Sequence, residues 1–97
     1  MKQYAGRYII GVQGYNSNQA TEGYVLSEDG TAQWMYIEND GRNGAHLTSK
    51  KYGTWNAHSG ELTVTIKGNT SAISETYQII GETFTNTTNP NRYLKEN

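Results

Sequence analysis

The sequence ELTVTIK, residues 61–67, decides the fold class of this chain. Its aliphatic residues occupy every second position, and polar residues lie between them. Successive side chains of a β-strand point to opposite faces of the sheet. A strand with one buried and one solvated face therefore has this pattern, which is typical of an antiparallel sheet.

Turn residues recur at short intervals on both sides of this strand, as an all-β protein requires. They include Asp29-Gly30, Asn39-Asp40-Gly41, Ser59-Gly60 and Gly68-Asn69. No segment repeats apolar residues at helical spacing over helical length. The sequence predicts eight strands, at residues 4–12, 21–27, 31–38, 47–57, 62–67, 73–80, 83–87 and 92–95.

The first testable hairpin has the loop 28–30, Glu-Asp-Gly. A three-residue loop with glycine in the left-handed conformation fits this sequence. It places Leu26 opposite Ala32 and Tyr24 opposite Trp34, so that Tyr24, Leu26, Trp34 and Tyr36 share one face. This self-consistent pattern supports the register.

A second hairpin turns at Ser59-Gly60 and leaves two registers open. One pairs Trp55 with Val64 and Ala57 with Leu62. A loop longer by one residue would turn Trp55 outward. We favour the first register because it buries the large ring with the aliphatic side chains.

The chain has 97 residues, which predicts a single domain over residues 1–97. Strands of this number and length favour a small antiparallel up-and-down β-barrel of about eight strands. Closure would remove the exposed edges of a sheet rich in tyrosine and isoleucine. A β-sandwich is the structural alternative.

Charge and composition exclude several partners. The net charge is -1 and no basic stripe is present, so we expect no nucleic acid partner. No apolar run approaches the about 18 residues of a membrane span. The N-terminus leaves two alternatives open: a cytoplasmic protein, or an exported periplasmic or lipid-anchored protein in which Met1 replaces a removed signal. The oligomeric state is left undetermined.

Several pieces of the sequence carry a family resemblance: GRY at 6–8, GYVLSEDGT at 23–31, YGTW at 52–55, GELTVTI at 60–66, YQIIG at 77–81 and YLK at 93–95. Together they resemble small bacterial lipocalin-like, calycin-type domains over most of the chain. The resemblance implies an up-and-down β-barrel, and many such proteins are exported, often as lipoproteins. This chain is much shorter than full lipocalins and has Tyr8 where they carry a tryptophan. Both departures argue against a roomy cavity.

Six aromatic residues are the candidate ligand-binding residues: Tyr8, Tyr24, Trp34, Tyr36, Trp55 and Tyr77. They predict either a pocket wall on which a flat ligand stacks, or a barrel core whose tyrosine hydroxyls reach the rim. The core interpretation is the commoner one for such rings. Trp34 is the residue to test first.

Other polar residues do not form a recognisable catalytic or metal centre. His46 and His58 have neither cysteine nor a second histidine at ligand spacing, so we expect surface histidines. The acidic pairs Glu28-Asp29 and Glu38/Asp40 adjoin predicted turns, where such residues are common. We therefore expect no enzyme, no metal and no cofactor.

The function predicted from these observations is the binding of a small apolar or aromatic ligand at the mouth of the barrel. The alternative is a carbohydrate- or protein-binding module in which exposed tyrosine and tryptophan side chains contact a glycan or another protein.

Overall fold

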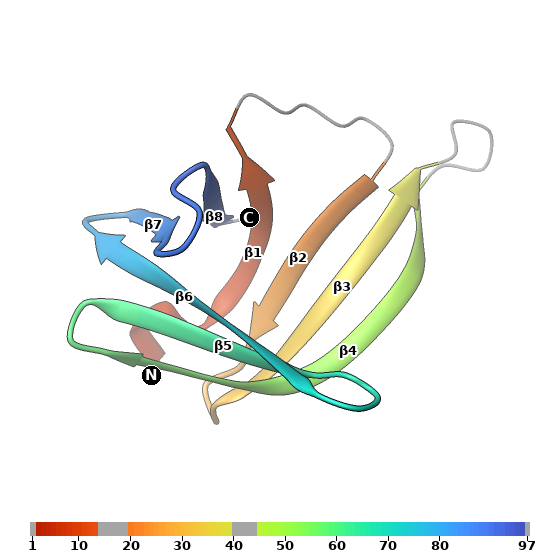
Figure 1. Ribbon diagram of the computed structural model, residues 1–97, viewed down its shortest axis with the longest axis horizontal. Helices are drawn as coiled ribbons and strands as arrows, with labels where there is room; N and C mark the ends of the chain where they lie inside the picture. The colour runs from red at the N-terminus through yellow and green to blue at the C-terminus, as the bar shows by residue number, and fades with distance from the viewer. Residues whose placement is uncertain (1, 14–19, 40–44, 97) are drawn as a thin grey trace.

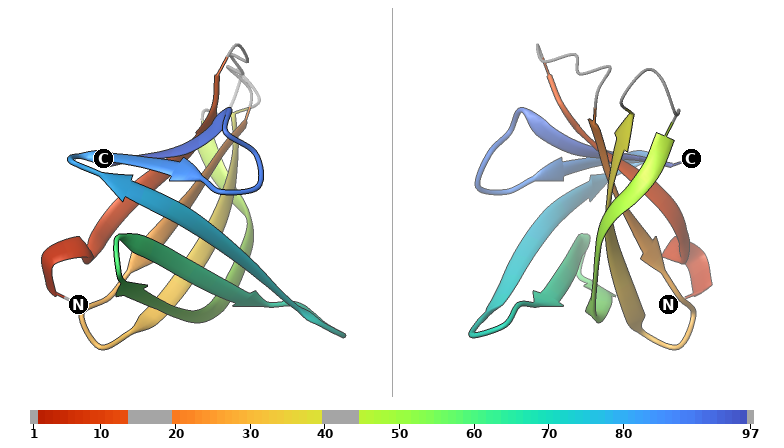
Figure 2. Two further views of the ribbon diagram at one scale, coloured as in Figure 1. Left: turned by 60° about the vertical axis from the view of Figure 1, so that its left-hand side comes forward. Right: turned by 90° about the vertical axis from the view of Figure 1, so that its right-hand side faces the viewer.

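Alternating inward and outward side chains build eight antiparallel strands into one closed barrel (Figure 1). The computed structural model describes residues 2–13, 20–39 and 45–96. Each strand pairs with the next, and the last pairs with the first, which confirms the barrel and excludes the sandwich. Figure 2 shows the strands crossing at steep angles, as strand tilt in a barrel requires. The strands are β1 (Gly6–Val12), β2 (Ala20–Leu26), β3 (Thr31–Asn39), β4 (Ala45–His58), β5 (Glu61–Lys67), β6 (Ala72–Ile80), β7 (Thr83–Asn86) and β8 (Arg92–Glu96).

The hairpin between β2 and β3 has the predicted register. Leu26 lies opposite Ala32 and Tyr24 lies opposite Trp34. Gly30 has a φ of 92°, the left-handed conformation that this loop needs and that glycine adopts without steric cost. The loop and the alternating pattern together fix which side chains point into the barrel.

The hairpin between β4 and β5 also has the favoured register. Trp55 lies opposite Val64, and its side chain is buried. Ser59 and Gly60 both have positive φ, at 53° and 78°, which matches a two-residue hairpin loop of the I′ type. The alternative register with an outward Trp55 is therefore wrong.

Every predicted strand overlaps an observed one, and the start of the first strand needs a correction. The prediction began it at Tyr4, but β1 begins at Gly6 and Lys2–Tyr4 form a short 3-10 turn, η1. The turn lets the Tyr4 ring pack edge-on against Phe84, with 6.1 Å between ring centroids. Its carbonyl also accepts a hydrogen bond of 2.7 Å from the Tyr8 hydroxyl. Tyr4 thus packs against the core from outside the strand.

The connections between strands alternate between the two ends of the barrel. We call "floor" the end with the β2–β3, β4–β5 and β6–β7 turns, and "mouth" the end with the β5–β6 and β7–β8 turns. The floor is filled with side chains. Its core includes Leu26, Trp55, Leu62 and Phe84, all at most 6% exposed. Tyr8 completes it by packing edge-on against Phe84 at 5.3 Å.

Candidate functional site

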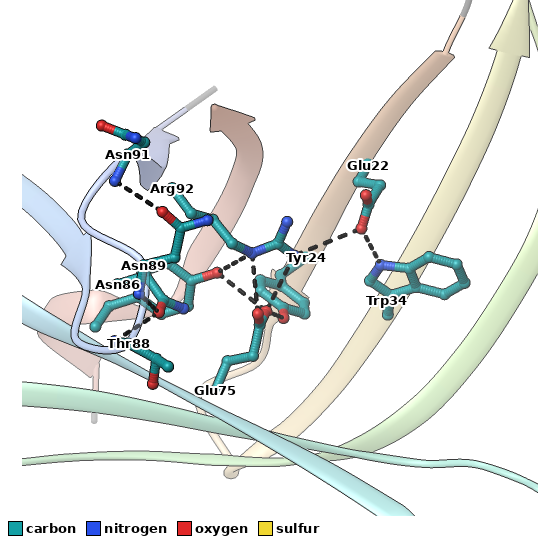
Figure 3. Close-up of polar contacts among 10 residues, drawn as sticks. Glu22, Tyr24, Trp34, Glu75, Asn86, Thr88, Asn89, Asn91 and Arg92 are labelled. Atoms are coloured by element: carbon teal, nitrogen blue, oxygen red, sulfur yellow. Dashed lines mark hydrogen bonds and ion pairs between the residues drawn. The ribbon is translucent and has the colours of Figure 1, made fainter. Parts of the chain in front are cut away.

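Four polar side chains meet inside the barrel on the mouth side of the floor core. Figure 3 labels Tyr24, Glu75 and Arg92 among them. Tyr24 comes from β2, Glu75 and Tyr77 from β6, and Arg92 from β8. We call these four residues the polar layer. In the closed strand order, β2 and β6 lie on opposite sides of the ring, so the layer spans the interior. The alternation of each strand directs these side chains inward.

Glu75 is the centre of the polar layer. Its Oε1 accepts hydrogen bonds from the Tyr24 hydroxyl at 2.6 Å, the Tyr77 hydroxyl at 3.1 Å and Arg92 Nη2 at 3.1 Å. Its Oε2 lies 2.9 Å from Arg92 Nε. Both carboxylate oxygens are therefore occupied, and the Arg92 contact is bidentate, the strong geometry for this pair.

The contacts of the polar layer set its protonation. Burial raises the pKa of Glu75, but hydrogen bonds from Tyr24 and Arg92 and the charge of Arg92 outweigh burial and lower it overall. Burial and the charge of Glu75 raise the pKa of Tyr77 to about 12. Burial and the hydrogen bond to Glu75 raise the pKa of Tyr24 as well. At neutral pH the layer therefore contains one ion pair and two neutral phenols.

A structured turn before β8 positions Arg92. Asn86, which is buried, accepts hydrogen bonds at its Oδ1 from the backbone N–H groups of Thr88 and Asn89, both at 2.9 Å. The carbonyl of Asn89 in turn accepts a hydrogen bond of 3.0 Å from the backbone N–H of Arg92. Side-chain bonds of this kind are typical of asparagine in turns. They fix the point at which β8 begins (Figure 3).

A cavity of about 220 Å³ lies at the mouth, with polar-layer residues among its walls. Glu22 contributes one wall: its Oε2 accepts a hydrogen bond of 3.1 Å from Trp34 Nε1 and lies 3.6 Å from Arg92 Nη2. The residues that line the cavity are Glu22, Tyr24, Trp34, Lys51, Ile66, Gly68, Ile73, Glu75 and Arg92.

The walls of the cavity divide into an apolar side and a charged side. Ile66 and Ile73 lie opposite each other on β5 and β6, and Ile73 is 68% exposed. Lys51 places its Nζ 5.5 Å from the centre of the Trp34 ring. Tyr36 stacks on the same indole, with 6.2 Å between centroids. The mouth thus offers a ligand both apolar surface and charged groups.

The six predicted aromatic residues separate into groups. Tyr24 and Trp34 line the cavity, and Tyr36 stacks beside it. Tyr8 and Trp55 are buried in the floor core. Tyr77, fully buried, belongs to the polar layer.

The charged residues of this site were not among those predicted from the sequence; they are Glu22, Lys51, Glu75 and Arg92. A signal was present: alternation places Glu22 on the face of Tyr24, and Glu75 on the face of Tyr77. A charged residue at an inward position of a barrel needs a partner, because an unpaired charge is costly to bury. Several such residues in one predicted barrel therefore indicate a polar site in its interior.

The remaining candidates lie away from the cavity or outside the described residues. His58 is exposed at the last position of β4, and the side chain of His46 lies outside what the structure describes. Asp29 accepts hydrogen bonds from the backbone N–H and the hydroxyl of Thr31, as its turn position predicts, and these lower its pKa. Asp40 lies outside the described residues.

Residues 2–13, 20–39 and 45–96 lack the features of several other site types. They contain no group of three potential metal ligands. No helix among them is long and apolar enough to cross a bilayer. Of their aromatic rings, Tyr52 is the only one that is largely exposed, at 59%.

Comparisons of the chain with family models, with curated proteins and with solved structures find no match. The class of this protein is therefore given by its architecture. It is an all-β, closed, eight-stranded antiparallel barrel with a filled floor, an interior polar layer and an open cavity at the mouth.

Proposed function

We propose that this protein is a non-enzymatic, lipocalin-like barrel that binds a small apolar or aromatic ligand at its mouth. The observation that carries the proposal is the cavity of about 220 Å³ that lies above a core of buried side chains. Mouths of β-barrels are common positions for ligand sites. The polar layer would form the base of this site.

The size and walls of the cavity limit the ligand. Pockets for drug-sized molecules are about 300–1,000 Å³, so this cavity suits a smaller compound. Trp34, Ile66 and Ile73 supply apolar surface, and Trp34 is held in place by its hydrogen bond to Glu22. A fixed ring costs little entropy when a ligand binds.

The bonding of the polar layer favours binding over catalysis. A general base needs a free oxygen within reach of the proton that it removes. Both oxygens of Glu75 already accept hydrogen bonds within the layer, and its lowered pKa makes it a weak base. These contacts support a structural role for Glu75.

The finer part of the proposal follows from the family resemblance. The closed eight-stranded barrel agrees with a lipocalin-like architecture. Bacterial origin, export and lipid anchoring remain proposals. The alternative, a glycan- or protein-binding module, needs several exposed rings in one patch, and in the described part of the chain only Tyr52 is of this kind.

Intrinsic tryptophan fluorescence tests the proposed function. Titration with a panel of small aromatic and aliphatic compounds should change the emission of Trp34, which lines the cavity. The Trp34→Ala variant should lose the response and some stability. In the control Tyr52→Ala, which removes an exposed ring, the response should persist. Unchanged fluorescence across the whole panel would contradict the proposal.

A further inference from the structure

We propose that the ligand of the mouth cavity is a small organic acid. Its apolar body would lie against Ile66 and Ile73, and its carboxylate would lie between Lys51 and Arg92. This inference rests on the proposed function and adds the chemical class of the ligand. It is carried by the donor groups of Lys51 and Arg92 that have no carboxylate partner among the described residues.

Both carboxylates of the cavity have partners within the protein. Glu75 is neutralised by the bidentate contact with Arg92 and also accepts from two tyrosine hydroxyls. Glu22 uses its Oε2 for the Trp34 indole N–H and for Arg92. A ligand cation at Glu75, or at Oε2 of Glu22, would therefore have to compete with these internal partners.

Lys51, in contrast, has a weak partner. Its ammonium lies over the face of Trp34, 5.5 Å from the ring centre. No carboxylate among the described residues forms an ion pair with it. A cation over a ring at an exposed site is held weakly, whereas a hydrogen-bonded pair with a carboxylate is stronger. A ligand carboxylate would supply that missing partner.

Arg92 adds a second donor on the same cavity. Its Nε and Nη2 are used within the protein, but Nη1 donates to no residue that the structure describes. The side chain is 20% exposed and lines the cavity. Because the guanidinium is held by Glu75, its free N–H groups are fixed in direction. Fixed donors of this kind suit the planar geometry of a carboxylate.

Lys50 provides a matched control for Lys51. The two lysines are adjacent on β4 and therefore point to opposite faces of the sheet. Lys50 lies over the exposed ring of Tyr52, with its Nζ 5.7 Å from the centroid, while Lys51 lies over Trp34 in the cavity. Replacing either lysine removes one positive charge and one cation–π contact, but only a replacement of Lys51 changes the cavity.

Calorimetric titration with three probes of one shape tests the inference. The probes are 2-naphthoate, the neutral 2-naphthamide and the cationic 2-naphthylmethylammonium. The naphthoate should bind about tenfold more tightly than the amide, as one added charge-assisted hydrogen bond provides. The cation should bind most weakly. The preference for the acid should decrease as salt is added.

The variants make the test specific. Lys51→Met should remove the preference for naphthoate over naphthamide, and Lys50→Met should retain it. Equal binding of naphthoate and naphthamide to the unaltered protein would overturn the inference that the ligand is an acid, but it would not contradict the proposed function. If none of the three probes bound and the fluorescence panel also failed, both proposals would fall.

Discussion

The hydroxyl oxygen of Tyr24 lies 2.6 Å from Oε1 of Glu75, although the two residues are 51 positions apart in the sequence. Their strands, β2 and β6, occupy opposite sides of the closed ring. The hydrogen bond therefore crosses the interior and ties the two halves of the barrel together. Beneath it the barrel is packed, and above it the barrel is open to the mouth cavity.

Replacing Glu75 by glutamine should destabilise the protein strongly. The substitution preserves the shape of the side chain but leaves the charge of Arg92 without its bidentate partner. Removing one partner of a fully buried ion pair costs about 3–5 kcal/mol, and this pair is only partly buried, so we expect a loss of about 2 kcal/mol. Urea unfolding would measure the loss. Glu61→Gln, at an exposed position of β5, should change the unfolding free energy by less than about 0.5 kcal/mol. Equal effects of the two substitutions would contradict this role for Glu75.

The stability of the protein should fall in acid because of the same carboxylate. The folded-state pKa of Glu75 lies below its ordinary value of 4.5, so the unfolded chain binds the proton first as the pH falls. The contribution of Glu75 is therefore complete above pH 4.5 and is lost as the pH falls through the folded-state pKa. Unfolding free energies measured between pH 7 and pH 3 should decrease with falling pH in the unaltered protein. A slope of the same size in Glu75→Gln would show that other groups cause it.

Alkaline pH should destabilise the barrel through Tyr77. Its folded-state pKa is raised from 10.0 to about 12, so the unfolded chain loses this proton first as the pH rises. The contribution of Tyr77 is complete below pH 10 and is lost as the pH rises through the folded-state value. Urea unfolding between pH 9 and pH 12 should show a smaller loss for Tyr77→Phe than for the unaltered protein. Identical losses would contradict the assignment.

Two truncations of aliphatic side chains should distinguish the filled floor from the open mouth. Leu62 is fully buried, and Leu62→Ala should cost about 3 kcal/mol through lost burial and the cavity left behind. Ile73 is 68% exposed at the cavity, and Ile73→Ala should cost less than about 1 kcal/mol. Thermal or urea unfolding of both variants would measure the difference. Similar costs would show that the mouth is packed as tightly as the floor.

The strand pattern and two hairpins could be predicted from the sequence because they depend on local signals. Alternation in residues 61–67 assigns each side chain to a face, and loop length fixes which residues lie opposite each other. The register of Tyr24 with Trp34 followed from this reasoning. The turn at Lys2–Tyr4 could not be predicted in this way, because it depends on packing of Tyr4 against Phe84, a contact between distant parts of the chain.

The polar layer could not be assembled from the sequence for the same reason. Alternation places Glu75 and Arg92 at inward positions, but it does not say that they meet. Their contact depends on the closed strand order and on the turn that Asn86 builds before β8. Alternation therefore predicts that the aromatic side chains point into the barrel. Which of them lie in the floor core, in the polar layer or at the mouth cavity is known only from the structure.

The central claim is that a ligand enters the mouth and leaves the floor undisturbed. The two tryptophans report on these regions separately: Trp34 lines the cavity, while Trp55 is buried and donates its indole N–H to the carbonyl of Ser27 at 2.8 Å. In a ¹⁵N–¹H correlation spectrum, titration with 2-naphthoate should shift the indole N–H signal of Trp34 and leave that of Trp55 in place. A shift of the Trp55 signal alone, or of neither signal at saturating probe, would contradict the account.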